Sequence, residues 1–146
     1  EYVSQNAEKE QDRVFCHHDM GHFLDVARLA EILNLTEAYG QDAELIYAAA
    51  LLHDIGRHIQ YETGEDHALV SARMAPAILK DCGFMQEETE QIVSAIATHR
   101  LAAVRDRKDL NGLLYRADKL SRPCYCCKQE SACNWKGDKK NRQLIW

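Results

Sequence analysis

An apolar run of eight residues, from Leu45 to Leu52, ends directly at the ionisable pair His53-Asp54. A run of this length without turn residues is typical of a helix that is buried against other elements. Burial of an imidazole and a carboxylate is costly unless a partner satisfies both groups. A bound metal ion can satisfy the two side chains at once. Any fold of this chain must therefore bury the run and satisfy the pair, and other His and Asp residues are candidates to share the site.

The remaining chain has a helical pattern almost throughout, with no internal repeat and no convincing strand alternation. We expect helices over residues 20–34, 42–56, 66–83, 86–100 and 109–120. Asp42 and Asp66 are suited to cap the second and third helices, Gly56 and Gly83 to end them, and Pro76 to kink the third. Residues 121–146 lose this periodicity. The sequence therefore predicts an all-α bundle of about five to six helices with an irregular Cys-rich C-terminal extension.

Length, charge and cysteine content limit the class of protein. The 146 residues correspond to one domain, and 46% apolar residues indicate a globular chain. A net charge of -5 argues against non-specific nucleic-acid binding but permits a phosphorylated small molecule. No apolar stretch approaches the ~18 residues of a membrane span, and the start shows no signal-peptide pattern. We expect a cytoplasmic protein with no nucleic-acid or membrane partner, and the oligomeric state stays open, with a dimer among the options.

Several ionisable residues lie on the apolar faces of the expected helices. This set consists of His22, His53, Asp54, His99 and Asp118, and His67 can reach inward from the start of its helix. Taken singly, each histidine could be a core residue bonded to a carbonyl, and each aspartate a cap or an ion-pair partner. Taken together, they would leave several buried polar groups uncompensated. One shared polynuclear metal site would remove that cost for all of them.

The order of these residues resembles the H…HD…D signature of the HD-domain metal-dependent phosphohydrolase superfamily. The segments HFLDVARLAEIL, AALLHDIGR and LLYRADKLSR are similar to the ligand-bearing helices of that family. DHALVSARMAPAIL and IVSAIATHR add His67 and His99, as in a dinuclear subgroup similar to the HD-class diadenosine tetraphosphate hydrolases and, more distantly, to the HD-type cyclic-dinucleotide phosphodiesterases. The resemblance covers about residues 17–122. It implies an HD domain over residues 1–122, with residues 123–146 as an extension of the same domain.

The chain also departs from the family pattern. Arg57 stands where the family often has Lys, and the Gly-Tyr-Pro element of the cyclic-dinucleotide enzymes is absent. His67 is not followed by the small Gly-Ala pair that is usual in the tetraphosphate hydrolases. The segment after Pro123 does not match those enzymes. These departures leave the exact substrate open.

The resemblance implies a site with two divalent metal ions. Asp54 is expected to bridge them, with His22, His53 and Asp118 on the first ion and His67 and His99 on the second. This donor set fits iron, manganese, cobalt, nickel or zinc better than magnesium or calcium, and the dinuclear family members imply iron. Two such ions suit hydrolysis of a phosphoester or phosphoanhydride through a metal-bridging hydroxide.

The residues beside the expected ligands include several candidates for substrate binding. We expect Asp54 and Lys119 to be catalytic. The phosphate-binding candidates are Arg57, His58, Arg100, Lys119 and Arg122. The alternative for each of these cations is a solvated surface charge. His17 and His18 are expected in an entry loop that lines the cleft.

Four cysteines near the C-terminus suggest a second metal site. Cys124, Cys126, Cys127 and Cys133 offer four thiols within a short segment, which zinc or an iron–sulfur cluster could use. Their spacing differs from the usual paired C-x2-C arrangement. The alternative is a flexible segment with free thiols in a reducing compartment.

The sequence therefore supports three hypotheses about function. The first is a metal-dependent phosphohydrolase that acts on a nucleotide or a similar phosphorylated small molecule. The second is a non-catalytic sensor domain that binds a nucleotide or a metal ion. The presence of all six ligand positions argues against this second hypothesis, since a site that no longer catalyses a reaction does not need every metal ligand. The third is a helical interaction domain whose histidines are incidental.

Overall fold

The computed structural model describes residues 1–144, and these residues form helices and turns without any strand. The α-helices, in chain order, are α1 (Tyr2–Lys9), α2 (Met20–Thr36), α3 (Ala43–Leu52), α4 (Arg57–Thr63), α5 (His67–Asp81), α6 (Gln86–Thr98) and α7 (Leu110–Leu120). Short 3-10 turns are η1 (Ala102–Val104), η2 (Cys124–Cys126), η3 (Glu130–Ala132) and η4 (Gly137–Lys139). The predicted all-α bundle is confirmed. Within residues 1–144 no helix has the length and apolarity that a bilayer crossing requires.

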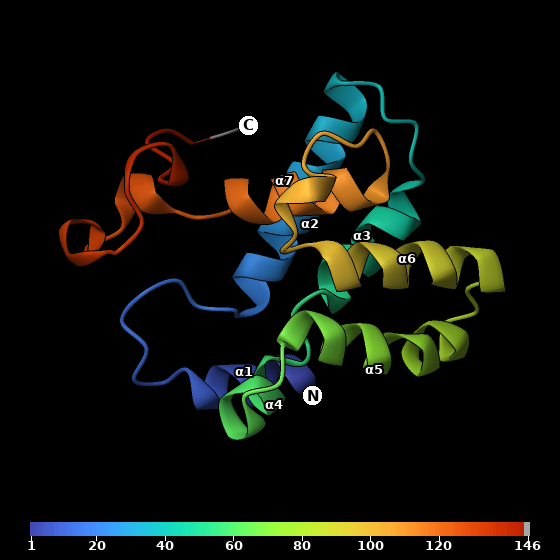
Figure 1. Cartoon of the computed structure of the whole chain (residues 1–146), viewed down its shortest axis with the longest axis horizontal. Helices are drawn as coiled ribbons and strands as arrows, with labels where there is room; N and C mark the ends of the chain where they lie inside the picture. Colours follow the sequence, from blue (N-terminus) through green and yellow to red (C-terminus); the bar gives the residue numbers. More distant parts are fainter. Residues whose placement is uncertain (145–146) are drawn as a thin grey trace.

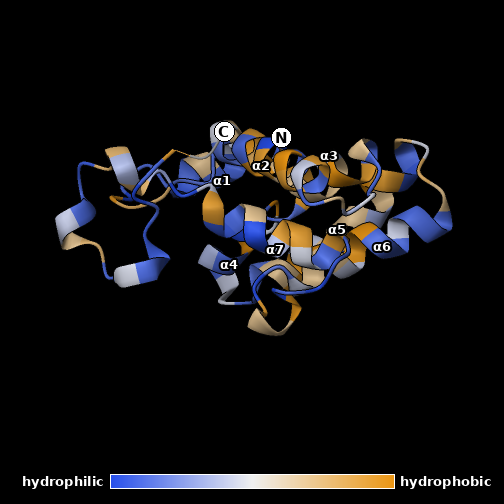
Figure 2. Ribbon diagram, turned by 90° about the horizontal axis from the view of Figure 1, so that it is seen from above, coloured by the Kyte–Doolittle hydropathy of each residue, from blue (hydrophilic) through white to orange (hydrophobic). Residues whose placement is uncertain are grey.

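Five helices enclose a single apolar core. Helix α2 packs on α3 and α7, α5 packs on α6, and α6 packs on both α3 and α7 (Figure 1). Fully buried side chains such as Phe23, Ile46 and Leu113 fill the interior. Burial of one such side chain contributes about 1.5–3 kcal/mol. In Figure 2 the strongly apolar segments accordingly lie within the bundle.

The helix ends follow local chemistry that the sequence predicts. Asp42 accepts a hydrogen bond from the Glu44 amide, and Asp66 accepts one from the Ala68 amide, both at 2.8 Å. Each carboxylate satisfies an amide that the first helical turn leaves without a partner. At the end of α5 the chain turns through Gly83 at φ +88°, the left-handed conformation that glycine adopts without strain. Pro76 lies inside α5, which continues beyond it to Asp81.

The prediction that Gly56 ends the second helix from a C′ position is wrong. Helix α3 ends at Leu52, and Gly56 is the N-cap of α4 with φ -86°. A glycine is needed there because the chain passes directly over α5. An added Cβ would lie 2.6 Å from Val70 Cγ1 and 2.9 Å from the Ser71 amide nitrogen. That close approach allows the Gly56 amide to donate a hydrogen bond to Ser71 Oγ at 2.9 Å.

Helices α1 and α4 were not among the predicted helices. They pack on each other, and α1 has only eight residues, few of them apolar, which gives too short a pattern from which to predict it. Its one buried residue is Asn6, whose amide donates to the Asp54 carbonyl at 2.9 Å and accepts from the His58 amide at 2.9 Å. Buried hydrogen bonds, rather than an apolar stripe, therefore attach α1 to the turn that follows α3.

The segment after α7 leaves the bundle and forms the irregular extension that the sequence predicts (Figure 1, orange to red). Asn141 attaches it to the end of α7, because its amide donates to the carbonyls of Lys119, Leu120 and Arg122 at 2.8–3.0 Å. The last two residues of the predicted extension, 145–146, lie outside the described residues. The division of the chain at residue 122 stays a prediction.

Gly112, in the first turn of α7, offers a direct test of this packing. An added Cβ would lie 2.1 Å from the Arg107 carbonyl oxygen and 2.9 Å from that of Val104, so backbone must move. We expect Gly112→Ala to lower the free energy of unfolding by about 2–3 kcal/mol in urea denaturation. In the control Gly21→Ala, the nearest atom is the movable Asp19 carboxylate at 3.1 Å. That variant should differ from wild type by less than about 1 kcal/mol, and equal losses in both variants would contradict the packing.

Candidate metal centre

Asp54 lies at the centre of a buried group of histidines. Its side chain follows the C-terminal end of α3 and is 2% exposed. Oδ1 lies 3.0 Å from His67 Nε2 and 3.5 Å from His99 Nε2. His67 is the first residue of α5, and His99 directly follows α6. One carboxylate oxygen thus faces a pair of imidazoles from two further helix ends.

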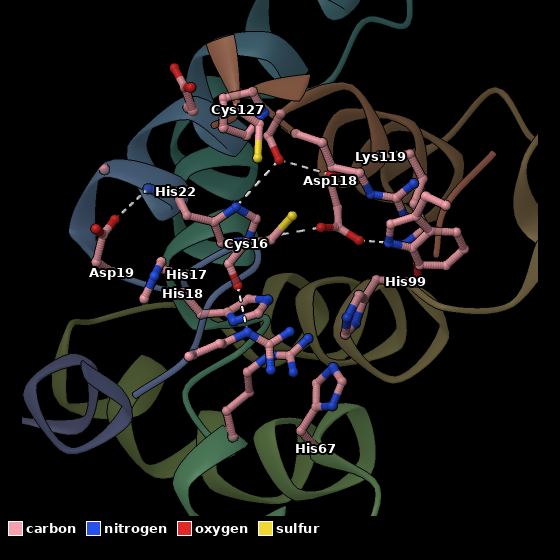
Figure 3. A pocket seen from close by; sticks show the side chains of 18 of the residues that line it. Cys16, His17, His18, Asp19, His22, His67, His99, Asp118, Lys119 and Cys127 are labelled. Atoms are coloured by element: carbon pink, nitrogen blue, oxygen red, sulfur yellow. Dashed lines mark hydrogen bonds and ion pairs between the residues drawn. The ribbon is translucent and has the colours of Figure 1, made fainter. Parts of the chain in front are cut away.

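The other oxygen of Asp54 faces a second group. Oδ2 lies 3.6 Å from His53 Nε2 and 3.9 Å from His22 Nε2. These two imidazole nitrogens are 3.3 Å apart, and His22 Nε2 is 3.8 Å from Asp118 Oδ1. His22 comes from the first turn of α2 and Asp118 from the last turn of α7. The six predicted ligand residues therefore meet at one place, and Figure 3 labels four of them there: His22, His67, His99 and Asp118.

Two of the histidines are oriented by the helices that precede them. His53 Nδ1 lies 2.6 Å from the Ala50 carbonyl, and His99 Nδ1 lies 2.7 Å from the Ile96 carbonyl. Each histidine is the C-cap of its helix and donates to a carbonyl of the last helical turn, three residues earlier; the Ile96 carbonyl also accepts from the His99 amide at 3.5 Å. A carbonyl only accepts, so each Nδ1 carries the proton. Each Nε2 therefore presents a lone pair toward Asp54.

Side chains, rather than backbone carbonyls, orient the other two histidines, and they too leave Nε2 facing the centre. His67 Nδ1 lies 2.6 Å from Gln60 Oε1. His22 Nδ1 lies 3.3 Å from Ser121 Oγ, whose own proton is donated to the Asp118 carbonyl at 2.8 Å. Both Nδ1 atoms are therefore donors, and both Nε2 atoms point their lone pairs into the centre. A histidine that binds a metal ion through one ring nitrogen usually donates a hydrogen bond from the other nitrogen to a partner of this kind.

The resulting centre contains hydrogen-bond acceptors that face one another. Asp54 Oδ1 and His67 Nε2 are buried without a hydrogen-bond partner, although they are 3.0 Å apart. Two acceptors in contact without a proton between them repel each other, and burial prevents water from separating their charges. A divalent cation removes this imbalance, and four imidazoles with two carboxylates are donors that transition metals accept. The described residues therefore fit a bound metal ion.

The protonation states of the centre are those that metal binding requires. Burial lowers the pKa of His53 to about 3, and it also lowers the pKa values of His22 and His67. Burial alone would raise the pKa of Asp54, but the electrostatic effects of His53 and of the Arg57 guanidinium hold it well below its ordinary value. Near neutral pH these imidazoles are thus uncharged and the carboxylate is ionised, so a metal ion displaces few protons.

His18 is a further residue of the centre, and a buried acid orients it. Its Nε2 lies 3.7 Å from Asp54 Oδ2, while Nδ1 lies 2.6 Å from Glu10 Oε1. The Tyr61 hydroxyl also donates to Glu10, at 2.6 Å. Burial would raise the pKa of Glu10, but the hydrogen bonds from His18 and Tyr61 outweigh it and lower that pKa to about 2. The sequence placed His18 in an entry loop and gave no signal for Glu10, because α1 was not expected.

A pocket of about 750 Å³ opens onto the metal centre. Its wall carries five basic side chains, those of Arg13, Arg57, Arg100, Lys119 and Arg122, and three acidic ones, those of Asp19, Asp25 and Asp118. The pocket wall therefore has an excess of positive charge, whereas the whole chain is acidic. Arg57 Nε lies 3.0 Å from Asp54 Oδ2, and the Lys119 ammonium contacts the Asp118 carboxylate. Arg100 forms an ion pair with Asp66 at 2.6 Å near the protein surface.

The remaining phosphate-binding candidates, Arg122 and His58, contact other parts of the chain. The Arg122 guanidinium stacks over the Trp135 ring at 4.4 Å and donates to the Lys139 carbonyl. His58 stacks on Tyr2 and contacts Asn6, and it is not among the residues that line the large pocket. The proposed roles of these residues in substrate binding stay predictions.

The C-terminal cysteines separate into two environments. Cys124, Cys127 and Cys133 line a second, smaller cavity together with Cys16. Cys126 is exposed, and its thiol donates to the Pro123 carbonyl at 3.5 Å. None of the six cysteines forms a disulfide, and all of them lie within residues 1–144.

Comparisons with known proteins match this description. A family model described as HD domain matches residues 19–122. An uncharacterized protein of Clostridium beijerinckii is 44% identical over 99% of this chain and 90% of its own length. Ribonuclease Y of Enterococcus faecalis is 29% identical over 80% of this chain but only 20% of its own length. A crystal structure of a predicted HD superfamily hydrolase from an uncultured Thermotogales bacterium has a TM-score of 0.63 and 31% identity, and the match covers 82% of this chain and 65% of that one.

Gln60 provides a test of how the metal centre is supported. Without its side-chain oxygen, His67 loses the partner that holds its ring and places its proton on Nδ1. We expect Gln60→Leu to weaken metal binding about 10- to 100-fold in chelator competition. Gln91→Leu, at an exposed position of α6, is the control and should bind metal like wild type. Unchanged affinity in Gln60→Leu would show that His67 needs no such support.

Proposed function

The chain belongs to the HD-domain family, and on that premise we propose that it is a metal-dependent phosphohydrolase. Its substrate is a nucleotide or a similar phosphorylated small molecule, in which it cleaves a phosphoester or phosphoanhydride bond. The solved relative named an HD superfamily hydrolase supports the reaction class. The observation that carries the proposal is the unsatisfied pair of Asp54 Oδ1 and His67 Nε2, in a group of imidazoles and carboxylates that faces a large pocket with five basic side chains.

Two metal ions are proposed, with Asp54 between them. Its two oxygens face different partners: Oδ1 faces His67 and His99, and Oδ2 faces His22 and His53. Asp118 lies on the His22 side. This division supports the assignment of His22, His53 and Asp118 to one ion and of His67 and His99 to the other. We favour iron, and the same donors accept manganese, cobalt, nickel or zinc.

The protein side chains then have distinct tasks. Bound ions lower the pKa of water and neutralise charge on phosphate oxygens. Asp54 stays ionised because Arg57 donates to it, and the buried imidazoles stay neutral and available as ligands. Lys119 is held beside Asp118 and 3.4 Å from the His99 carbonyl, at the boundary between the metal centre and the pocket. From there its ammonium can contact a reacting phosphate or donate a proton to a leaving oxygen.

Substrate phosphate is proposed to bind along the basic wall. The ion pair between Arg100 and Asp66 is about half exposed, and exposed pairs contribute at most about 1 kcal/mol. Arg100 can therefore exchange this partner for a phosphate at little cost, and a guanidinium can bind phosphate through two parallel hydrogen bonds. Arg57 and Arg122 also line the pocket.

The names of the relatives do not identify the substrate of this chain. The matches to proteins named ribonuclease Y cover only 14–20% of those proteins, so their activity does not transfer with the match. The overall charge of -5 favours a small phosphorylated molecule over a nucleic acid. A short RNA is included among the test substrates, because its cleavage would favour the alternative that the substrate is a nucleic acid. Cytoplasmic location and oligomeric state stay predictions.

The proposal is tested by turnover of metal-replete protein against nucleotides, dinucleoside polyphosphates, a chromogenic phosphodiester and a short RNA. We expect release of phosphate or of a nucleoside phosphate from at least one small molecule. Asp54→Ala should hydrolyse that substrate at least about 100-fold more slowly, and it should no longer retain bound metal. Asp106→Ala, which removes an exposed carboxylate, should keep both.

Two results would contradict the proposal. One is the absence of turnover across the panel while nucleotides still raise the melting temperature of metal-replete protein, which would favour a sensor domain. The other is hydrolysis at the same rate by Asp54→Ala and wild type, which would place the activity outside this centre.

A further inference from the structure

Four cysteines from two distant parts of the chain surround one small cavity of about 40 Å³ beside the large pocket. Cys16 comes from the loop between α1 and α2, and Cys124, Cys127 and Cys133 come from the extension after α7. Phe15, Pro123 and Trp135 contribute the apolar part of the wall. Cys126 lies between these cysteines in the sequence, but it is exposed and does not line the cavity.

Three of the four thiols, those of Cys16, Cys124 and Cys133, interact electrostatically. Burial raises the pKa of Cys16, and the nearby Cys124 and Cys133 raise it further. Each of the four is partly buried, unlike the exposed Cys82 and Cys126. Four soft sulfur ligands that meet in a partly enclosed apolar site are the usual environment of zinc or of an iron–sulfur cluster.

We propose that Cys16, Cys124, Cys127 and Cys133 bind an iron–sulfur cluster. The geometry distinguishes it from a single zinc ion, whose bonds to sulfur would hold the four sulfur atoms roughly 3.8 Å apart. Among the described residues no three cysteine sulfurs lie within 4.8 Å of one another. A cavity lies between them instead, as a polynuclear centre with inorganic sulfide requires.

The charges around the cavity suit an anionic cluster. Lys140 and Glu130 both line the cavity and form an ion pair at 2.9 Å, and the Lys140 side chain is only 8% exposed. Arg122 lowers the pKa of Cys16 by its charge, against the effect of burial. From 123 to 144 the extension has five basic and two acidic residues, although the whole chain is acidic. This local excess of positive charge would offset the charge of four thiolates.

A cluster at this position would also define one wall of the large pocket. Cys16, Cys127 and Trp135 line both cavities, and Figure 3 shows the first two beside the histidines of the metal centre. The cluster would join the loop before α2 to the extension after α7. The proposal does not depend on the phosphohydrolase activity, since its ligands are separate from the His and Asp set.

The test is anaerobic reconstitution of the full chain with ferric iron, sulfide and dithiothreitol, whose thiols reduce part of the iron as the cluster assembles. Acid-labile sulfide is the decisive measurement, because iron held by the His and Asp centre brings no sulfide with it. We expect bound sulfide together with visible charge-transfer absorbance in wild type. Cys16→Ser should lose most of both, whereas Cys126→Ser and Cys82→Ser, the matched controls, should keep the wild-type amounts.

A second measurement needs no variant and therefore does not depend on whether Cys16→Ser folds. Alkylation of reconstituted wild type, followed by mass spectrometry, should leave the four ligand cysteines protected and modify Cys82 and Cys126. Equal modification of all six cysteines would overturn the proposal. So would colourless protein that binds one zinc ion at these cysteines and takes up no sulfide.

Discussion

The structure depends on an electrostatic imbalance at the centre of the helical bundle. Four imidazole nitrogens present lone pairs toward the Asp54 carboxylate, and at least two of the buried atoms have no hydrogen-bond partner. A protein interior does not tolerate such a group of acceptors unless a cation compensates it. The fold must therefore hold several unfavourable groups together, and a bound metal ion turns that cost into a source of stability.

The helix ends provide the means of holding them. His53 and His99 are both C-caps, and each donates its Nδ1 proton to a carbonyl of the helix that it ends. The same bond turns Nε2 of each histidine toward the centre. His67, at a helix start, has Gln60 instead, because the amides of a first turn offer no acceptor. The termini of α3, α5 and α6 can thus converge without loss of their own hydrogen bonds.

Much of this arrangement could be predicted from the sequence, and the exceptions have a common cause. The five long helices follow from apolar periodicity, and the six proposed ligand positions follow from polar residues that interrupt it. Helix α1 and the buried Glu10 could not be predicted from periodicity. Asn6 attaches α1 by a hydrogen bond to the distant Asp54 carbonyl, and Glu10 is held by His18 and by the distant Tyr61 hydroxyl. The role of Gly56 differs from the prediction for a similar reason: it depends on the close approach of the chain to α5, which the local sequence does not reveal. The association of Cys16 with the C-terminal cysteines is likewise a long-range property.

The most direct test of the metal centre is a crystal structure of metal-replete protein, with diffraction data collected on both sides of the absorption edge of the bound metal. We predict two anomalous peaks beside Asp54, one on the side of His22, His53 and Asp118 and the other on the side of His67 and His99. The absence of an anomalous peak beside Asp54 in such crystals would contradict the central claim that these residues form a metal centre.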